Sequence, residues 1–473
     1  GPTVMTMRDV FDGLFALAGE RLDDHLQLTP LQTLARHAWP DGSRFDLHAD
    51  RAATLDAIGR LAGAGAARQY AAFCTRARAI YETLDGPYLR SSRPTPVSLA
   101  WRCARGGFGQ WLALLRISPF QTLWRELGRQ FADPRLRQLF ARYATYGGSS
   151  PLAAPATLML IAHVEQAGVW SVQGGMHQLA QALAALAQRL GVRIDCGRTV
   201  ARVLVEQGRA AGVELLGDDG RPGERLPAAG VVFNGDVAAL GAGLLGPAVQ
   251  PAVSRQPAAR RSLSALTWNL LAPTAGFALL RHTVFFSGDY PREFHELFAQ
   301  GRLPTEPTVY VCAQDRADQP LPAGAAGSPP ERLLVLVNAP ALGDRGAPTD
   351  EEIAACERRS FEHLARLGLQ LRPSGPDALR HAPAHWAQRF PATGGALYGQ
   401  ATHGWRSSFS RPAAATALPG LFLAGGSTHP GAGVPMAALS GLLAAQAVLA
   451  AQPGRTSTST WRPAAMPGGT STR

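Results

Sequence analysis

A glycine-rich segment near the end of the chain combines the residue types and the spacing best suited to chemistry. The apolar run 421–424 ends in Gly425 and Gly426, and a turn, 427–433, leads to Pro435 and a long apolar stretch. Proline fits the first turn of a helix, where no amide hydrogen is needed, so we predict a strand, a turn and a helix start. Glycines let a ligand approach the backbone closely, and the free amides and positive dipole end of a helix favour negative charge.

This arrangement favours a flavin, whose reduced form carries negative charge on the pyrimidine edge of its ring. A plain glycine-rich turn without a ligand is the alternative. His429 is the only titratable side chain in the turn, and it could either take a proton or merely orient the loop. Trp386 and Arg389, which precede the glycine pair 394–395, are candidates for lining a substrate channel.

The composition excludes several other chemistries. The 473 residues include 46 basic and 35 acidic ones, a formal charge of +11, and every basic residue is arginine. Without lysine there is no Walker phosphate loop, no Schiff-base lysine and no pyridoxal chemistry. The arginines form no basic block interleaved with aromatic residues, so no nucleic acid is expected as a partner, and contact of a basic face with anionic lipid is favoured instead.

Cysteine usage indicates the redox compartment, and hydropathy indicates whether a membrane-spanning helix is expected. Five cysteines lie far apart without a Cys-x-x-Cys pair, so no metal site and no disulfide framework is predicted, and a reducing cytoplasm is expected. The uncharged stretches 143–164 and 412–454 are interrupted by glycine and proline, whereas a spanning helix needs about 20 continuous apolar residues. Both are therefore predicted to be buried interior. The Ser-, Thr- and Pro-rich tail 453–473 is predicted to be disordered.

The first third of the chain is predicted to be helical. Within 10–145, the segments 28–36 and 52–60 carry apolar residues at three- and four-residue steps. An aromatic and aliphatic run is interpreted as a buried helix pair, or alternatively as a face that touches lipid or an elongated apolar ligand. This run comprises Trp101, Phe108, Trp111, Leu112, Leu115, Phe120 and Trp124.

The middle of the chain is predicted to alternate helix and strand. A leucine stripe over 176–190 predicts a helix that Gly191 ends. The predicted strands are 192–196, 200–205, 213–215, 231–234 (buried), 308–312 and 333–337. A helix, a strand, a three-stranded meander and a further strand in this order are typical of flavin-binding α/β folds. The segment 241–246 fits Gly-x-Gly-x-x-Gly, but it follows a short helix and precedes Pro247, so no cofactor role is expected for it.

The turn also carries a family resemblance. The run 428–435, Thr-His-Pro-Gly-Ala-Gly-Val-Pro, resembles the C-terminal signature of bacterial carotenoid desaturases, the phytoene desaturase family. The branch that acts on hydroxylated or methoxylated acyclic carotenoids, the 1-hydroxycarotenoid 3,4-desaturases or methoxyneurosporene dehydrogenases, looks most similar. Segments that resemble the family or this branch are 1–4, 168–176, 263–265, 282–287, 307–310 and 434–441. The similarity covers nearly the whole chain.

The resemblance implies an α/β architecture, a Rossmann-like FAD-binding fold of the amine oxidase type with an interleaved α+β substrate domain. The FAD-binding domain would comprise 1–9, 166–240 and 412–452, and the substrate and membrane-facing domain 10–165 and 241–411. The family's glycine-rich pyrophosphate loop and ribose-binding acidic residue would precede Gly1. The chain is therefore expected to lack the first βαβ unit and to bind FAD poorly or not at all.

The resemblance also implies roles for individual residues. Positions that match the segment along the flavin and its ribityl chain are Gly425, Gly426, Gly433, Val434, Pro435 and Met436. Thr3, Val4 and Thr6 match a stretch near the isoalloxazine, Val200 a strand position at the adenine, and Asn234 the edge of the cofactor cleft. An acidic residue often occupies the place of Gly426 in the wider amine oxidase-like group, so one ribityl anchor is missing.

The activity implied is FAD-dependent desaturation of an acyclic carotenoid, in which a hydride leaves for the flavin and quinone or oxygen serves as a possible electron acceptor. A long apolar tunnel and peripheral attachment to the cytoplasmic side of the inner or photosynthetic membrane are expected. The alternatives are a related desaturase, a carotenoid isomerase, an amine oxidase-like enzyme and a carotenoid-binding fragment without catalysis. An aromatic cage around the flavin would favour the amine oxidase.

Overall fold

A mixed β-sheet forms the largest layer of the computed structural model, which describes residues 3–105, 107, 109, 114, 117–316, 330–371 and 378–452. From one edge to the other the seven strands are β14 (Leu379–His381), β10 (Ser264–Ala272), β13 (Glu331–Ala339), β12 (Val309–Ala313), β11 (His282–Phe285), β3 (Thr33–Ala38) and β4 (Arg44–His48). β11 and β3 are parallel, whereas the other neighbours are antiparallel. Branched and aromatic residues fill the central strands, as a sheet covered on both faces requires.

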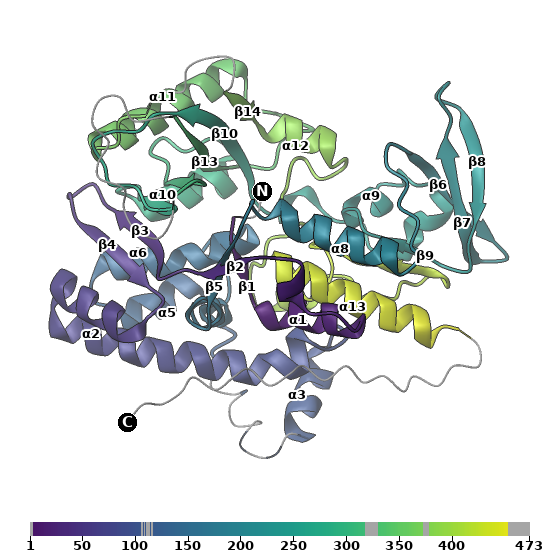
Figure 1. Cartoon of the computed structure of the whole chain (residues 1–473), viewed down its shortest axis with the longest axis horizontal. Coiled ribbons are helices and arrows are strands. Elements are labelled where there is room, and N and C mark those ends of the chain that lie inside the picture. The colour runs from purple at the N-terminus through teal and green to yellow at the C-terminus, as the bar shows by residue number, and fades with distance from the viewer. Residues whose placement is uncertain are drawn as a thin grey trace.

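Alternation along the central strands divides the sheet into two faces. Val309, Val311 and Val335 point to a core shared with helix α11 (Asp350–Arg366), whose first turn is closed by a Thr349–Glu352 capping box. The intervening residues point to the opposite face, toward α2 (Arg51–Leu84), α5 (Leu123–Gln130), α6 (Pro134–Ala141) and α7 (Leu160–Gln166). Figure 1 shows α11 on one side of the sheet and α2 on the other.

A second group of elements surrounds the glycine-rich turn. Strands β15 (Leu421–Leu423) and β9 (Val231–Phe233) pair in parallel, and β15 leads to helix α13 (Val434–Ala450). Helices α1 (Arg8–Leu17) and α8 (His177–Arg189) share a core with the start of α13. A small sheet joins β1 (Met5–Thr6), β5 (Val169–Val172) and β2 (Leu28–Pro30). The meander β6 (Val200–Glu206), β7 (Arg209–Leu216) and β8 (Pro222–Pro227) stands at one end of the molecule (Figure 1).

Three short helices complete the described elements used below: α3 (Pro96–Arg105), α9 (Val237–Gly241) and α12 (Pro383–Arg389). The segment 241–246 begins at the last residue of α9. As predicted, it does not connect a strand to a helix. None of the described helices is long and apolar enough to cross a membrane. The stretch 143–164 contributes short turns and α7 to the core, and α13 packs beside α1.

Several predicted elements are confirmed, namely the helix at 176–190, the meander, the strands at 308–312 and 333–337, and the strand, turn and helix from 421 onward. The helical assignment of 28–36 is wrong, because these residues form β2 and β3, which pair with β5 and with β11 and β4. The strand predicted at 192–196 is absent, since no described strand pairs with it, and Val192 and Ile194 are exposed. β9 forms as predicted, but Val232 on it is 47% exposed, so the strand is not fully buried.

The aromatic run does not form the buried helix pair that we predicted. Trp101 on α3 is 59% exposed and Phe120 is 73% exposed, whereas Trp124 packs against the core. Phe108, Trp111, Leu112 and Leu115 lie outside the described residues, as do residues 317–329 and 453–473. The exposed aromatic residues therefore favour the alternative interpretation, a face that touches lipid.

Candidate functional site

A cavity of about 500 Å³ lies between the seven-stranded sheet, helices α2 and α7, and the start of α13. The residues predicted to lie near a flavin ring come together on its wall, although they come from opposite ends of the chain. They are Thr3, Val4, Thr6, Gly433, Val434, Pro435 and Met436. The rest of the wall is largely apolar and includes aliphatic side chains, for example Leu84 on α2, Ile161 on α7 and Leu336 on β13, together with several tyrosines. The cavity thus joins a backbone turn suited to a cofactor to an apolar chamber.

The backbone of the turn depends on glycine at two positions. Gly425 has a φ of 108°, and a Cβ atom there would lie 2.8 Å from Oδ1 of Asn234. The parallel pairing of Leu423 with Phe233 places Asn234 beside the turn, and its role at the edge of the cofactor cleft stays a prediction. Gly433 has a φ of 117° and occupies the N-cap of α13, where it offers no side chain to the first amides.

These features fit a flavin. Val434 and Met436 present the first turn of α13 to the cavity, and the positive end of the helix dipole favours the negative charge of a reduced ring. A Cβ atom at Gly426 would meet nothing within 4 Å. The space for the acidic ribityl anchor expected from the resemblance is therefore present, but glycine does not supply the anchor. Val200 lies on the half-exposed β6 of the meander, away from the cavity wall, and its role at the adenine stays a prediction.

His429 is held by the backbone and does not form part of the cavity wall. Its Nε2 lies 2.9 Å from the carbonyl oxygen of Tyr88 and 3.0 Å from that of Ser91. Because carbonyl oxygens only accept, Nε2 carries the proton and donates to both. Burial lowers the pKa of His429 to about 4, so the ring is neutral at pH 7. The structure gives His429 a positioning role, and its catalytic role stays an untested prediction.

Trp386 and Arg389 lie on α12, outside the cavity wall. The indole Nε1 of Trp386 donates to the carbonyl oxygen of Ala265 at 3.0 Å, and its ring stacks on His381. Nothing in this arrangement brings either side chain to the chamber, so their assignment to a substrate channel has no support from the structure and stays a prediction.

The sequence analysis missed Arg411, a buried arginine that fixes the turn. Its Nη1 donates to the carbonyl oxygen of Gly426 at 2.7 Å, and its Nη2 donates to the carbonyl oxygens of Tyr398 and Gln400. Burial lowers the pKa of Arg411. The side chain lines the cavity and brings a cation to the glycine turn. No motif marks this residue, since its partners are backbone carbonyls.

A group of polar side chains on the cavity wall also went unpredicted. It comprises Arg142, Tyr143, Tyr146, Glu165, His282 and Tyr310, which we call the polar cluster. Burial raises the pKa of Glu165, and burial together with the charge of Arg281 lowers the pKa of His282 to about 3. These residues come from three separate parts of the chain, so their spacing in sequence gives no signal of the cluster.

Comparison with known proteins identifies the protein family of this chain. Residues 12–449 match the family of flavin-containing amine oxidoreductases, and the chain belongs to this family. FAD is therefore its cofactor. Two solved structures share the fold: an oxidoreductase from Methanosarcina mazei (TM-score 0.52, 14% identity, 91% of this chain and 84% of that one) and a triple mutant of putrescine oxidase (TM-score 0.51, 13% identity, 96% and 88%). The predicted α/β, Rossmann-like FAD-binding fold is confirmed.

Within this family the chain groups with the carotenoid desaturases. It is 52% identical to the hydroxyneurosporene desaturase of Rubrivivax gelatinosus, over 100% of this chain and 87% of that protein. It is 47% identical to the hydroxyneurosporene desaturase of Cereibacter sphaeroides, over 95% and 87%. A more distant relative, at 29% identity over 95% and 88%, is the 4,4'-diapolycopene oxygenase of a Methylomonas species. The family resemblance of the glycine-rich turn is thereby confirmed.

Proposed function

We propose that this protein desaturates an acyclic hydroxylated or methoxylated carotenoid at its 3,4 bond. One observation supports this most: the turn that fits a flavin and the large aliphatic chamber are parts of the same cavity. A polyene held along the aliphatic wall would reach the cofactor without meeting water. The wall carries tyrosines as well as aliphatic side chains, and its extended apolar surface favours a long polyene over a small amine.

The side chains of the chamber need to supply little acid–base chemistry. When bound, FAD accepts the hydride that leaves the carotenoid. The cation left on the substrate is allylic and delocalised, so its proton leaves readily and needs no strong base. Glu165 already accepts hydrogen bonds from Tyr143 and Tyr146, and His429 lies off the wall. The chain's contribution is to exclude water and to hold the reacting bond in place.

The test loads the full chain with FAD and supplies 1-hydroxyneurosporene in liposomes, with either a quinone or oxygen as electron acceptor. We expect a product that has lost two hydrogen atoms, measured by chromatography and mass spectrometry. Comparing the two acceptors in the same assay identifies the one that reoxidises the flavin. Flavin-loaded protein that binds the carotenoid and leaves its mass unchanged under both conditions would support a carotenoid-binding protein and overturn the proposal.

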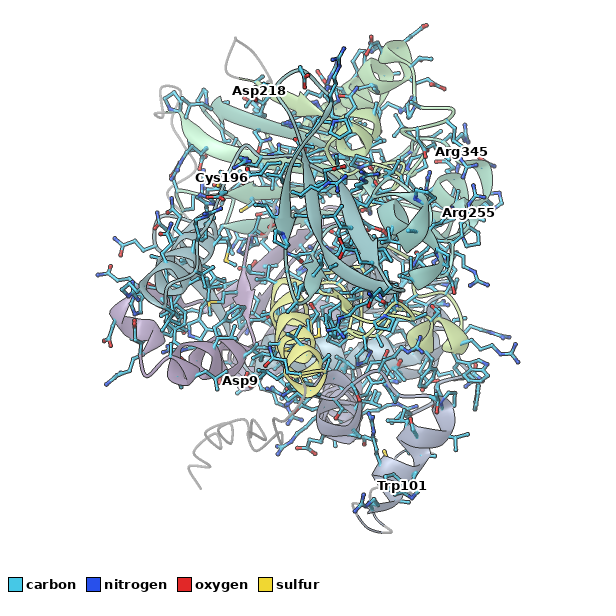
Figure 2. All side chains as sticks on the ribbon, turned by 90° about the vertical axis from the view of Figure 1, so that its right-hand side faces the viewer. Asp9, Trp101, Cys196, Asp218, Arg255 and Arg345 are labelled. Carbon is cyan, nitrogen blue, oxygen red and sulfur yellow. The ribbon has the colours of Figure 1, made fainter. Side chains whose placement is uncertain are left out.

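We also propose that a face around α3 rests on the cytoplasmic surface of an anionic membrane. Val97 and Trp101 are 80% and 59% exposed, and Arg105 lies 4.5 Å over the Trp101 ring. The exposed Phe120 packs on Trp405, which lines the cavity. Figure 2 shows Trp101 at the tip of a protrusion. Exposed aromatic residues beside arginines suit the interface of anionic lipid, where the substrate dissolves.

Vesicle flotation tests this membrane contact. We expect the chain to float with anionic vesicles, and the double variant Trp101→Ser/Phe120→Ser to lose most of that binding. Leu379→Ser is the matched control, because Leu379 is 61% exposed on β14, an edge strand far from α3 in Figure 1. Equal flotation of the double variant and the wild type would contradict the assignment of this face.

A further inference from the structure

The polar cluster contrasts with the rest of the chamber. A hydrocarbon polyene offers no hydrogen-bonding atom along most of its length, so a buried arginine on the wall needs another explanation. Arg142 lies deep within the protein, yet part of its surface stays accessible because it lines the cavity. Among the described residues its guanidinium finds one hydrogen-bond acceptor, the hydroxyl of Tyr146 at 3.0 Å from Nη1. Its Nε and Nη2 donors are left for a ligand.

The surroundings of Arg142 hold it without using up its donors. The hydroxyls of Tyr146 and Tyr143 donate to the two oxygens of Glu165, at 2.9 and 2.7 Å, so the carboxylate balances the cation through a tyrosine. The guanidinium carbon lies 5.1 Å from the ring centre of Tyr146 and 5.6 Å from that of Tyr310. Two aromatic faces thus bracket the cation and fix its orientation.

The cluster reaches the segment predicted to lie near the flavin ring. The hydroxyl of Tyr310 lies 2.9 Å from Oγ1 of Thr3 and 2.8 Å from Nδ1 of His282. His282 Nε2 is buried without a partner among the described residues. Through Tyr310 the polar cluster therefore contacts Thr3, one of the residues predicted to lie near the flavin ring.

We infer that Arg142 binds the oxygen atom on the end group of the carotenoid and so selects oxygenated substrates. A guanidinium only donates, and the oxygens of a tertiary alcohol and of a methyl ether both accept. One residue therefore serves the hydroxylated and the methoxylated end group alike. This inference rests on the proposed function, and it names the residue that sets the substrate class.

The position of the cluster agrees with the proposed regiochemistry. The oxygen is attached to C1, and two carbon–carbon bonds separate C1 from C3 of the bond that loses hydrogen. A residue that binds this oxygen must therefore lie near the flavin ring. Arg142 lies over the ring of Tyr310, whose hydroxyl contacts Thr3, a residue predicted to lie near the flavin. A carotenoid without the oxygen would leave the buried guanidinium unsatisfied, and sites built for a hydroxyl reject such analogues strongly.

The experiment measures binding and turnover with 1-hydroxyneurosporene, its 1-methoxy ether and neurosporene, which lacks the oxygen. Binding is followed by quenching of tryptophan fluorescence, which does not depend on activity. The variants are Arg142→Met, which removes every donor, and Arg142→Lys, which keeps a cationic donor. Arg137→Met is the matched control, because Arg137 stacks on Trp124 at 3.8 Å in the same part of the chain and lies outside the cavity wall.

We expect the wild type to prefer both oxygenated carotenoids over neurosporene. Arg142→Met should weaken binding and turnover of the oxygenated pair by roughly 10- to 100-fold, the range for a hydrogen bond to a charged group. It should bind neurosporene more tightly than the wild type does, because no buried donor is then left unsatisfied. Arg142→Lys should recover part of the preference, and Arg137→Met should retain all of it.

Two results would overturn the inference: a wild type that binds neurosporene as tightly as the hydroxylated carotenoid, or an Arg142→Met variant that weakens all three ligands equally. Failure of the proposed function looks different. In that case no substrate is desaturated, while the binding preference and its dependence on Arg142 still decide whether the cluster recognises oxygen.

Discussion

The hydrogen bonds of His429 indicate that it positions a segment of the chain and does not act as a catalytic base. Nε2 donates to two carbonyl oxygens on the segment after α2, which ties that segment to the glycine-rich turn. A proton taken up during turnover would have to go to Nδ1, which is buried and has no partner among the described residues. We therefore regard the link between the two segments as the role of this side chain.

His429→Gln should keep most of the activity, because the amide nitrogen of glutamine can donate to the same carbonyl oxygens. His429→Ala should lower the free energy of unfolding by about 1–3 kcal/mol, the cost of leaving buried acceptors without donors. Thermal unfolding and turnover measured side by side check both variants. A glutamine variant that folds normally, binds FAD and has lost turnover would make His429 a catalytic residue.

At the scale of single residues, sequence reasoning found the backbone of the site more readily than its side chains. The glycines and the proline of the turn are contiguous and have few other uses, so their pattern is informative. Arg142 and Arg411 are two among 46 arginines, and both act through partners remote in sequence. Only the fold shows which arginines are buried beside the chamber.

At the scale of elements, the unit of strand β15, turn and helix α13 carries the proposed cofactor site. Gly425 must adopt a positive φ so that the turn can pass Asn234, and a serine hydroxyl on α13, that of Ser440, accepts the hydrogen bond from the Gly425 amide at 2.7 Å. The turn is thus fixed from both sides. Its geometry, more than any titratable group, determines whether the start of α13 faces the cavity.

Gly425→Ala should destabilise the turn and reduce the flavin content, because its Cβ atom would meet Asn234 at 2.8 Å and its φ is 108°. Strain of this kind costs about 1–3 kcal/mol. Gly441→Ala on α13 is the matched control, since a Cβ atom there meets nothing within 4 Å and Gly441 has no predicted role at the flavin. Flavin absorbance after dialysis and the unfolding midpoint are the measurements. Equal losses in both variants would contradict the geometry of the turn.

The segments that sequence reasoning misassigned are those whose structure depends on distant strands. In 28–36 the local spacing resembled a helix, but pairing with distant strands decides the structure of β2 and β3. At 192–196 the residues alternate as in a strand, but no described strand lies beside them to form backbone hydrogen bonds. Local periodicity contains no information on either neighbour, whereas the meander succeeds because all its pairing is local.

At the scale of the whole molecule, burial of neutral histidines links stability to pH. Burial lowers the pKa of His37 and of His282 to about 3 and that of His429 to about 4, against an ordinary value of 6.5. Between pH 6.5 and 4 these histidines bind protons in the unfolded chain but stay neutral in the folded chain. The contribution of these histidines to the free energy of unfolding is therefore complete above pH 6.5 and is lost as the pH falls.

The unfolding midpoint should accordingly rise from pH 5 to pH 6.5, since each such histidine costs the folded state about 2 kcal/mol at pH 5. Glu293, whose pKa burial raises to about 7, acts in the opposite sense, as do Glu165 and Asp236, whose pKa values burial also raises. These carboxyl groups are fewer than the histidines whose pKa burial lowers. His429→Gln should make the acid limb shallower, and the same change at the exposed His177 should leave it unchanged. A flat profile from pH 5 to 6.5 would contradict neutral burial.

The arrangement of the whole chain explains why one cavity can serve both cofactor and substrate. Segments from both ends of the chain form the side proposed for the flavin, and the sheet with its helical layer forms the side proposed for the polyene. The fold class follows from the family resemblance, but the junction of the two sides, where the polar cluster lies, depends on tertiary packing that no single segment reveals.

The central claim is that a flavin held at the start of α13 takes hydrogen from an acyclic carotenoid in the adjoining chamber. A single-turnover reaction tests it most directly: the FAD-loaded chain is mixed with one equivalent of 1-hydroxyneurosporene without oxygen, and flavin and carotenoid are analysed together. We expect the oxidised flavin to bleach while the carotenoid loses two hydrogen atoms. An unchanged flavin beside an unchanged carotenoid, or a product that forms only with oxygen and is heavier by an oxygen atom, would contradict this account.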